Sequence, residues 1–307
     1  DWQIIIDKIK AGKAHEISEG DTMYLAACTK GANAKSMRKQ PFSDIPAKQR
    51  AYSLKSSYMT AYVRRILMNE DVISVFKPEE LKSKSVDELL HERFAPYIGR
   101  TLYELKRHIN FAENKNKAMY ANLVSDLLGI KGTSLDDTEE FAKANIKFKT
   151  IRLEPNGVPR EHMSFEQIDF DRWINASWEE SQVYETFENT KFLFVVFQFT
   201  ETERENPNRV PYLKGIKLWN MPEQIIETEL KNLWKTVHDI LAVGVELTQT
   251  PRGVKNNLPG AKFNGVCHIR PKAANAADKV QLPDGQMITK QTYWLNREYI
   301  AEIVREL

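Results

Sequence analysis

The sequence contains only two cysteines in 307 residues, Cys28 and Cys267, and they lie far apart. So few cysteines exclude a disulfide framework and favour a reducing cytoplasm as the location. Long apolar runs are also missing: the longest, residues 192–199, suits a buried strand and is far shorter than the roughly 18 residues that span a membrane. No signal-peptide pattern opens the chain. Because the first residue is Asp1 rather than Met, we expect a processed chain or a fragment of a longer protein.

Charge of one sign is not in excess overall, since the net charge is only +2, but its distribution along the chain is uneven. Residues 30–65 carry nine Lys or Arg against one acidic residue, and residues 250–297 carry eight against two. Between them, residues 136–189 carry thirteen acidic side chains against six basic ones. Two basic stretches around an acidic one are typical of a protein that binds a polyanion, and solvated surface charge is the alternative.

The first 75 residues have the pattern of helices joined by loops. Apolar side chains recur at helical spacing at Tyr52, Leu54, Tyr58, Tyr62, Ile66 and Leu67. Basic residues stand between them, which permits phosphate contacts, although a core-facing stripe is the simpler interpretation. A polar segment, residues 77–85, marks a boundary. We expect a helical connecting region over residues 1–88 and a second domain over residues 89–307.

The second domain combines helices with strands. Capping patterns that begin at Ser85 and Thr101 predict two helices, and a third is expected over residues 114–129. Strands are expected over residues 145–153, 192–200, 212–219 and 265–270, and a further helix begins after Pro222 and ends near Val243. A strand-rich centre between helices predicts an α/β fold with a mixed central sheet flanked by helices and a mostly helical N-terminal extension.

Five strings, collinear along the chain, resemble the MutH family of GATC-specific DNA endonucleases. They are residues 99–105 (GRTLYEL), 123–129 (LVSDLLG), 141–150 (FAKANIKFKT), 270–275 (RPKAAN) and 282–285 (LPDG). RPKAAN is the most specific of them. The spacing of residues 257–260, 267–271 and 293–296 is similar to the C-terminal, non-cutting half of the staphylococcal GATC-cutting type II restriction endonuclease. The resemblance implies a restriction-endonuclease-like (MutH-like) fold, here a pseudo-nuclease DNA-binding domain.

The same resemblance implies that the nuclease motif has lost its metal ligands. Cutting members use an Asp, and then a Glu-x-Lys, to hold Mg²⁺ beside the phosphate and to activate water. By spacing, the Asp falls on Glu140 and the Glu on Lys147, and only Lys149 keeps its type. A carboxylate expected upstream falls on Ser125, and a basic residue expected downstream falls near Thr186. An ammonium group would repel each charge of a cation by roughly 4 kcal/mol at 4 Å. We therefore expect no metal or other cofactor in this chain, and Mg²⁺ only in the parent enzyme.

DNA recognition is assigned by the resemblance to the C-terminal strings. An arginine forms two hydrogen bonds with guanine in the major groove, and a proline after it stiffens the loop. The expected DNA-binding residues are Arg270, Pro271, Lys272, Asn275, Lys290, Gln291, Lys255 and Lys262. Arg270 and Pro271 are expected to reach base edges, whereas Lys255 and Lys262 contact phosphates. For Arg270 the alternative is a surface salt bridge. Cys267 is expected in the core, and His268 as a hydrogen-bonded strand residue.

These expectations describe the C-terminal recognition and effector domain of a type II, two-site restriction endonuclease. Duplex GATC bound here would activate cleavage by the N-terminal catalytic half of the same polypeptide, a step that the resemblance alone implies. One alternative is an active nuclease that uses Asp136, Asp137 and Glu140 as rearranged metal ligands. The other is a dimerisation module, and a homodimer is left open. Its contacts would come from aromatic residues such as Trp219, Trp234, Tyr293 and Trp294.

Overall fold

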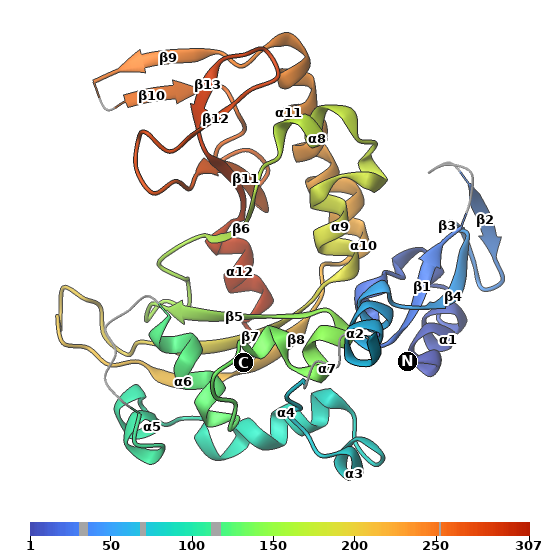
Figure 1. Cartoon of the computed structure of the whole chain (residues 1–307), viewed down its shortest axis with the longest axis vertical. Coiled ribbons are helices and arrows are strands. Elements are labelled where there is room, and N and C mark those ends of the chain that lie inside the picture. The colour runs from blue at the N-terminus through green and yellow to red at the C-terminus, as the bar shows by residue number, and fades with distance from the viewer. Residues whose placement is uncertain (31–35, 68–71, 112–117, 252) are drawn as a thin grey trace. The chain divides into compact units, whose positions relative to one another are not determined.

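The computed structural model describes residues 1–30, 36–67, 72–111, 118–251 and 253–307, and Figure 1 shows its helices and strands. Contacts between residues divide the chain into two compact units. The first unit comprises residues 1–158, 189–221 and 304–307, and the second comprises residues 159–188 and 222–303. Each unit is therefore assembled from segments that lie far apart in the sequence.

A three-stranded mixed sheet forms the centre of the first unit (Figure 1). β5 (Ile146–Leu153) runs parallel to β7 (Lys191–Gln198), and β8 (Tyr212–Trp219) pairs antiparallel with the other edge of β7. β7 is buried over all but its last residue because its sequence presents apolar side chains to both faces of the sheet. All three strands lie where the alternating and apolar runs predicted them.

Helices cover one face of this sheet. They are α4 (Val86–Phe94), α5 (Leu102–His108), α6 (Met119–Leu127) and α7 (Glu139–Ala144), whose apolar side chains share a core with alternate residues of the three strands. The capping residues Ser85 and Thr101 accept hydrogen bonds from the N–H groups of Glu88 and Glu104, as predicted. α6 confirms the predicted third helix from Met119 onward, while residues 114–117 lie outside the described residues. The predicted α/β class is thus confirmed.

The N-terminal part contains strands where the sequence pattern predicted mainly helices. Besides α1 (Trp2–Lys10), α2 (Ser56–Leu67) and α3 (Pro78–Leu81), it forms the antiparallel pairs β1 (Leu25–Thr29) with β4 (Arg50–Leu54) and β2 (Met37–Gln40) with β3 (Ser43–Lys48). Tyr52 and Leu54, which the helical spacing assigns to the start of an apolar stripe, belong to β4, since a spacing of two residues fits a strand. The predicted boundary after residue 88 falls within α4, inside the first unit.

The second unit is built on an antiparallel sheet in which β14 (Gln291–Leu295) lies between β11 (Cys267–Pro271) and β6 (Met163–Gln167). β11 confirms the predicted final core strand. Two short hairpins accompany the sheet: β9 (Leu247–Thr250) with β10 (Gly253–Asn256), and β12 (Lys279–Gln281) with β13 (Met287–Thr289). The helices of the unit include α8 (Phe170–Asn175), α9 (Gln182–Asn189) and α12 (Arg297–Ile303).

The helix predicted after Pro222 is present but not uniform. It begins as α10 (Glu223–Ile225), passes through a π-helical turn over residues 226–230, and continues as α11 (Lys231–Val243), which ends before Gly244. α11 buries Leu233, Val237 and Leu241 at helical spacing, as the sequence pattern predicted. Within the described ranges, no helix combines the length and the apolar character that a membrane crossing requires.

Candidate nucleic-acid interface

The RPKAAN string begins at the end of β11, and two of its cations lie on an aromatic ring. Arg270 and Lys272 are both exposed. The Arg270 Cζ lies 5.8 Å, and the Lys272 Nζ 6.0 Å, from the ring centroid of Trp294 on β14. The Trp294 indole N–H donates to the Arg270 carbonyl oxygen at 3.2 Å, which holds the ring beside the end of the strand. Two cations therefore share one aromatic support at the edge of the sheet.

The two cations differ in their partners within the unit, and Arg270 is the one more available to a ligand. The Lys272 Nζ donates a 2.7 Å hydrogen bond to the hydroxyl of Ser164 on β6. In the described part of the chain, Arg270 forms no salt bridge. The structure therefore does not contain the surface salt bridge that was the alternative for this residue. Pro271, which follows Arg270, is exposed and lies opposite Gln291 in the pairing of β11 with β14.

The loop after β11 is closed by Asp278. Its carboxylate accepts a 3.0 Å hydrogen bond from the Ala274 N–H and forms a 2.7 Å ion pair with Lys290. This lysine, together with the N–H, holds the pKa of Asp278 below its usual value. Asn275 is exposed, and its side-chain oxygen accepts from the Ala277 N–H at 2.9 Å. The string that carries the predicted contacts is thus a structured loop, with Lys290 serving as one of its internal partners.

The remaining predicted contact residues differ in exposure. Gln291 is only 2% exposed, and its amide donates to the Thr289 carbonyl at 2.7 Å. Its side chain therefore stabilises the turn before β14 and is not presented at the surface, because burial and that bond hold it inward. Lys255, on β10, and Lys262, in the turn before β11, are both exposed, as phosphate contacts require.

A buried histidine lies behind the Trp294 support. His268 is 1% exposed, its ring is nearly parallel to that of Trp294, and its Nδ1 lies 2.5 Å from the Asn296 Oδ1. Because the Asn296 amide nitrogen donates to the Ala261 carbonyl, its oxygen is the acceptor and the His268 Nδ1 carries the proton. The His268 Nε2 has no partner among the described residues. The predicted hydrogen bonding is thus confirmed for one ring nitrogen.

Burial determines the protonation states of the residues behind the Trp294 ring. It lowers the pKa of His268 to about 4, so the imidazole is neutral at pH 7. His162 packs edge-on against it, with 4.6 Å between the ring centroids. The neighbouring Cys267 is 2% exposed, as predicted for a core residue, and burial raises the pKa of its thiol to about 12. Neither His268 nor Cys267 has the accessibility or the ionisation of a nucleophile.

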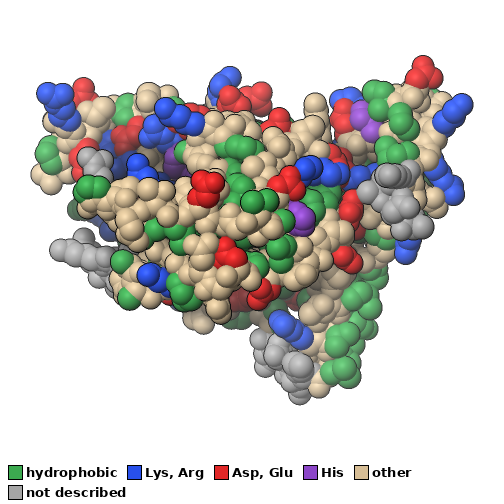
Figure 2. All heavy atoms as spheres, turned by 90° about the horizontal axis from the view of Figure 1, so that it is seen from above, with side chains coloured by type: hydrophobic (Ala, Val, Ile, Leu, Met, Phe, Trp, Pro, Cys, Tyr) green, Lys and Arg blue, Asp and Glu red, His purple; other side chains and the backbone are tan. Residues whose placement is uncertain are grey.

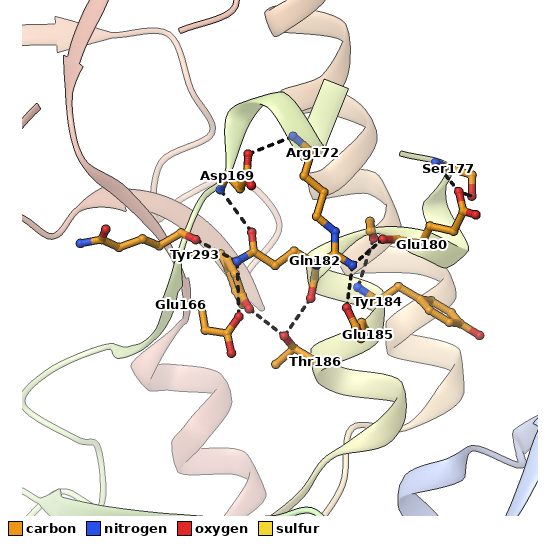
Figure 3. Close-up of polar contacts among 12 residues, drawn as sticks. Glu166, Asp169, Arg172, Ser177, Glu180, Gln182, Tyr184, Glu185, Thr186 and Tyr293 are labelled. Atoms are coloured by element: carbon orange, nitrogen blue, oxygen red, sulfur yellow. Dashed lines mark hydrogen bonds and ion pairs between the residues drawn. The ribbon is translucent and has the colours of Figure 1, made fainter. Parts of the chain in front are cut away.

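Thr186 stands where the resemblance expects a basic residue, and its hydroxyl contacts two uncharged groups (Figure 3). Its hydroxyl donates to the Gln182 carbonyl at 2.8 Å and lies 2.8 Å from the hydroxyl of Tyr293 on β14. Since the Thr186 hydroxyl proton is donated to the Gln182 carbonyl, the Tyr293 hydroxyl is the donor in the hydrogen bond between the two side chains. Burial raises the pKa of Tyr293. Position 186 thus supports the central strand of the sheet.

In the first unit, β5 carries Lys147 and Lys149 two residues apart, and so on the same face of the sheet. The Lys147 Nζ lies 4.0 Å from the Asp136 Oδ2, while the Asp136 Oδ1 accepts a 2.7 Å hydrogen bond from the Phe148 N–H. Burial raises the pKa of Asp136, although that N–H and the two lysines favour its charged form. The carboxylate beside the lysine pair is therefore Asp136, which the alignment by spacing did not select.

Glu140, which the alignment places at the metal-binding Asp, is used elsewhere. It is 2% exposed and accepts hydrogen bonds from the Ser74 hydroxyl and from the N–H groups of Val75 (2.9 Å) and Phe76 (3.3 Å). These bonds tie the segment before α3 to α7. Ser125, the other aligned position, lies on α6 and contributes no carboxylate.

The residues on β5 do not fit a divalent cation. The ammonium groups of Lys147 and Lys149 both act on the Asp136 carboxylate, and the Glu140 carboxylate is engaged by three donors. Within the described residues, no three His, Cys, Asp or Glu side chains come together in a way that could hold a metal ion. The rearranged set of Asp136, Asp137 and Glu140 is therefore not assembled in this structure.

Several basic side chains of residues 30–65 form hydrogen bonds or ion pairs within the protein. The buried Lys55 donates to the Ala144 carbonyl at 3.2 Å, Arg50 donates to the Ala27 carbonyl at 2.7 Å, and Arg65 forms a 2.7 Å ion pair with Glu139. On the face drawn in Figure 2, basic and acidic side chains are interspersed. Charge counted along the sequence thus overstates the positive surface that this stretch provides.

The aromatic residues considered for dimerisation pack within their own units. The Trp219 ring stacks on that of Phe194, and the Trp234 ring packs against that of Trp178. Tyr293 is buried, with 2% of its surface exposed. Trp294 supports the cation pair described above. Their packing accounts for them without a partner chain.

Comparison with known proteins places this geometry in a family. A family model described as DNA mismatch repair enzyme MutH matches residues 128–233. The type II restriction enzyme Sau3AI of Staphylococcus aureus is 38% identical over 347 aligned residues, which cover 100% of this chain and 69% of that enzyme. The DNA mismatch repair protein MutH of Actinobacillus pleuropneumoniae is 25% identical over 231 residues (73% of this chain, 94% of the relative), and that of Vibrio campbellii is 28% identical over 191 residues (61% and 77%).

The fold, the β5 motif and the RPKAAN loop define a MutH-like endonuclease domain. By its similarity to Sau3AI over its whole length, the chain belongs to the MutH-like family of GATC restriction endonucleases.

Proposed function

We propose that this chain is the DNA-recognition and effector domain of a two-site type II restriction endonuclease, and that it binds duplex GATC without cutting it. The observation that carries the proposal is the exposed pair of Arg270 and Lys272, held over Trp294 at the end of β11 within the string most specific to the family. The family membership supports duplex DNA as the ligand.

Base reading is assigned to Arg270. Its guanidinium has no ionic partner in the described residues, and a guanidinium can form two hydrogen bonds with the O6 and N7 atoms of guanine. Pro271 stiffens the loop, and Lys272 and Asn275 contact phosphates or base edges beside it. Lys290 acts by closing the loop on Asp278 and brings its charge near the duplex.

Affinity that does not depend on sequence is assigned to other residues. The exposed Lys255 and Lys262 suit phosphate contacts, whose contribution falls with salt. Gln291 positions the turn before β14, since its side-chain amide donates to the Thr289 carbonyl.

Absence of cutting is supported by the β5 site. Lys147 lies 4.0 Å from the Asp136 carboxylate, and an ammonium group at that separation would repel each charge of Mg²⁺ by roughly 4 kcal/mol at an effective dielectric of about 20. In the proposed parent enzyme a separate catalytic half of the same polypeptide uses Mg²⁺, and occupancy of this domain increases its activity. A homodimer is a further arrangement in which this domain could act.

Equilibrium binding to a GATC duplex and to a scrambled duplex, with Mg²⁺ and with EDTA, tests the proposal. We expect tighter binding to GATC, no dependence on Mg²⁺ and a steep loss of affinity with salt. Equal affinity for the two duplexes would contradict sequence recognition. No binding at low salt would instead favour an interaction module that does not bind DNA.

A further inference from the structure

The helix α2 presents an apolar stripe to solvent. Met59, Tyr62, Val63 and Ile66 recur at helical spacing on one side of the helix, and each is between 43% and 56% exposed. Of the 19 strongly exposed large apolar side chains in the described residues, 13 lie within residues 1–73. The exposure is therefore concentrated in the N-terminal part. Single exposed apolar residues are ordinary, but a continuous stripe indicates a surface that another structure covers.

The neighbouring side of α2 is already occupied by α7, beside which it lies (Figure 1). The Ser57 hydroxyl donates to the Lys143 carbonyl at 2.9 Å, and the Lys143 Nζ lies 5.5 Å from the ring centroid of Tyr58. Arg65 forms its ion pair with Glu139 on the same helix α7. Because these contacts fix the rotation of α2, the helix cannot turn its stripe inward without breaking them.

The stripe belongs to a part of the chain that the MutH protein of Actinobacillus pleuropneumoniae lacks. That relative is matched over 94% of its own length by 73% of this chain, and the strings that resemble the family begin at residue 99. Only 22 residues follow the last string, so most of the unmatched residues lie in the N-terminal part. Sau3AI, in contrast, is matched by the whole chain, yet only 69% of that enzyme is covered. The N-terminal part is thus shared with a restriction enzyme that has further residues outside the match.

One face of α2 is too small to hold two separate chains together. A helix of 12 residues is about 18 Å long and about 10 Å wide, so one face offers roughly 200–400 Å². A stable complex of separate proteins buries about 800 Å² on each partner. A segment of the same polypeptide needs less, because a covalent tether keeps its effective concentration in the millimolar range. The size of the stripe therefore favours a tethered occupant over a second copy of this chain.

We propose that the α2 stripe, formed by Met59, Tyr62, Val63 and Ile66, is the surface on which the catalytic half of the same polypeptide docks. This inference rests on the proposed function, which assigns that half to the parent enzyme. The partner surface is an apolar groove, into which a helix inserts side chains at positions i, i+3, i+4 and i+7. Through α7 the docked half is joined to the central sheet, since β5 follows α7 after a single residue.

Amide hydrogen exchange in α2 tests the docking surface. Exchange is compared between this chain alone and the complete parent polypeptide, each at low concentration. We expect the α2 amides to exchange at least about tenfold more slowly in the parent polypeptide. Val63→Asp should abolish this slowing, because a carboxylate cannot be buried in an apolar groove without a partner, whereas Val63→Ile should keep it. Val210→Asp, at another exposed valine of the first unit, is the matched control and should leave it unchanged.

The outcomes separate this inference from the proposed function. Ile66→Gln provides a second polar variant that favours a helix, and circular dichroism establishes that each variant is folded. Equal exchange of α2 in this chain and in the parent polypeptide would overturn the docking surface, as would protection that this chain acquires alone by dimerisation, which sedimentation detects. A preference of this chain for GATC would leave the proposed function standing in either case. A parent polypeptide without a catalytic half would overturn both.

Discussion

Replacing Arg270 with Ala should reduce the preference for GATC while leaving the domain folded. The arginine is exposed, and its interaction within the unit is the one with the Trp294 ring at 5.8 Å. A cation–π contact at an exposed site contributes about 0.5–1 kcal/mol, so the loss of stability should not exceed about 1 kcal/mol. A two-bond contact with guanine contributes about 1–3 kcal/mol of discrimination. The ratio of affinities for GATC and scrambled duplexes should therefore fall by roughly 5- to 150-fold.

Fluorescence anisotropy with both duplexes at one salt concentration measures this ratio. Lys255→Ala is the matched control, because Lys255 is an exposed cation of the same unit on β10. It should weaken binding to both duplexes by the same factor and leave the ratio unchanged. If Arg270→Ala behaves in this same way, the arginine contacts only phosphates and the argument for base reading is refuted.

Three further variants test the internal contacts. Glu140→Ala leaves the donors of residues 74–76 without their acceptor and should lower the free energy of unfolding in urea by about 3 kcal/mol with no change in the GATC preference; wild-type stability would contradict the assigned role. The pKa of His268 is about 4 in the folded chain and about 6.5 when unfolded, so the unfolded chain takes up the proton first as the pH falls. Stability should then decrease by up to about 3 kcal/mol between pH 6.5 and 4, and His268→Gln should flatten this part of the profile; an unaltered profile would argue against it. Tyr293→Phe removes the bond to Thr186 and should cost about 1 kcal/mol, and in a double-mutant cycle Thr186→Val should add little more; additive losses would show that the two hydroxyls act independently.

The sequence alone predicts the elements whose signals are local. The caps at Ser85 and Thr101 depend on residues three positions apart, and β5, β7 and β8 are marked by alternation or by continuous apolar runs. The strands β1 to β4 were not predicted because they are short. In addition, the change from strand to helix after Leu54 left a continuous apolar stripe in the sequence.

Contacts between distant segments could not be read from the sequence. The motif spacing identifies Glu140, but only the fold shows that its carboxylate turns to residues 74–76 and that Asp136 stands beside Lys147. Likewise, Trp294 lies 24 residues after Arg270, and no local pattern connects the ring to the arginine. Gln291 matched a basic stretch of the family by position, yet strand pairing buries it.

Recognition of GATC without cleavage can be followed in a single assay with unmethylated GATC plasmid and Mg²⁺. Binding and strand integrity are followed in the same samples, alongside Lys149→Ala. We expect the plasmid to be bound and to stay intact with either chain. Nicking at GATC that requires Mg²⁺ and disappears in Lys149→Ala would contradict it.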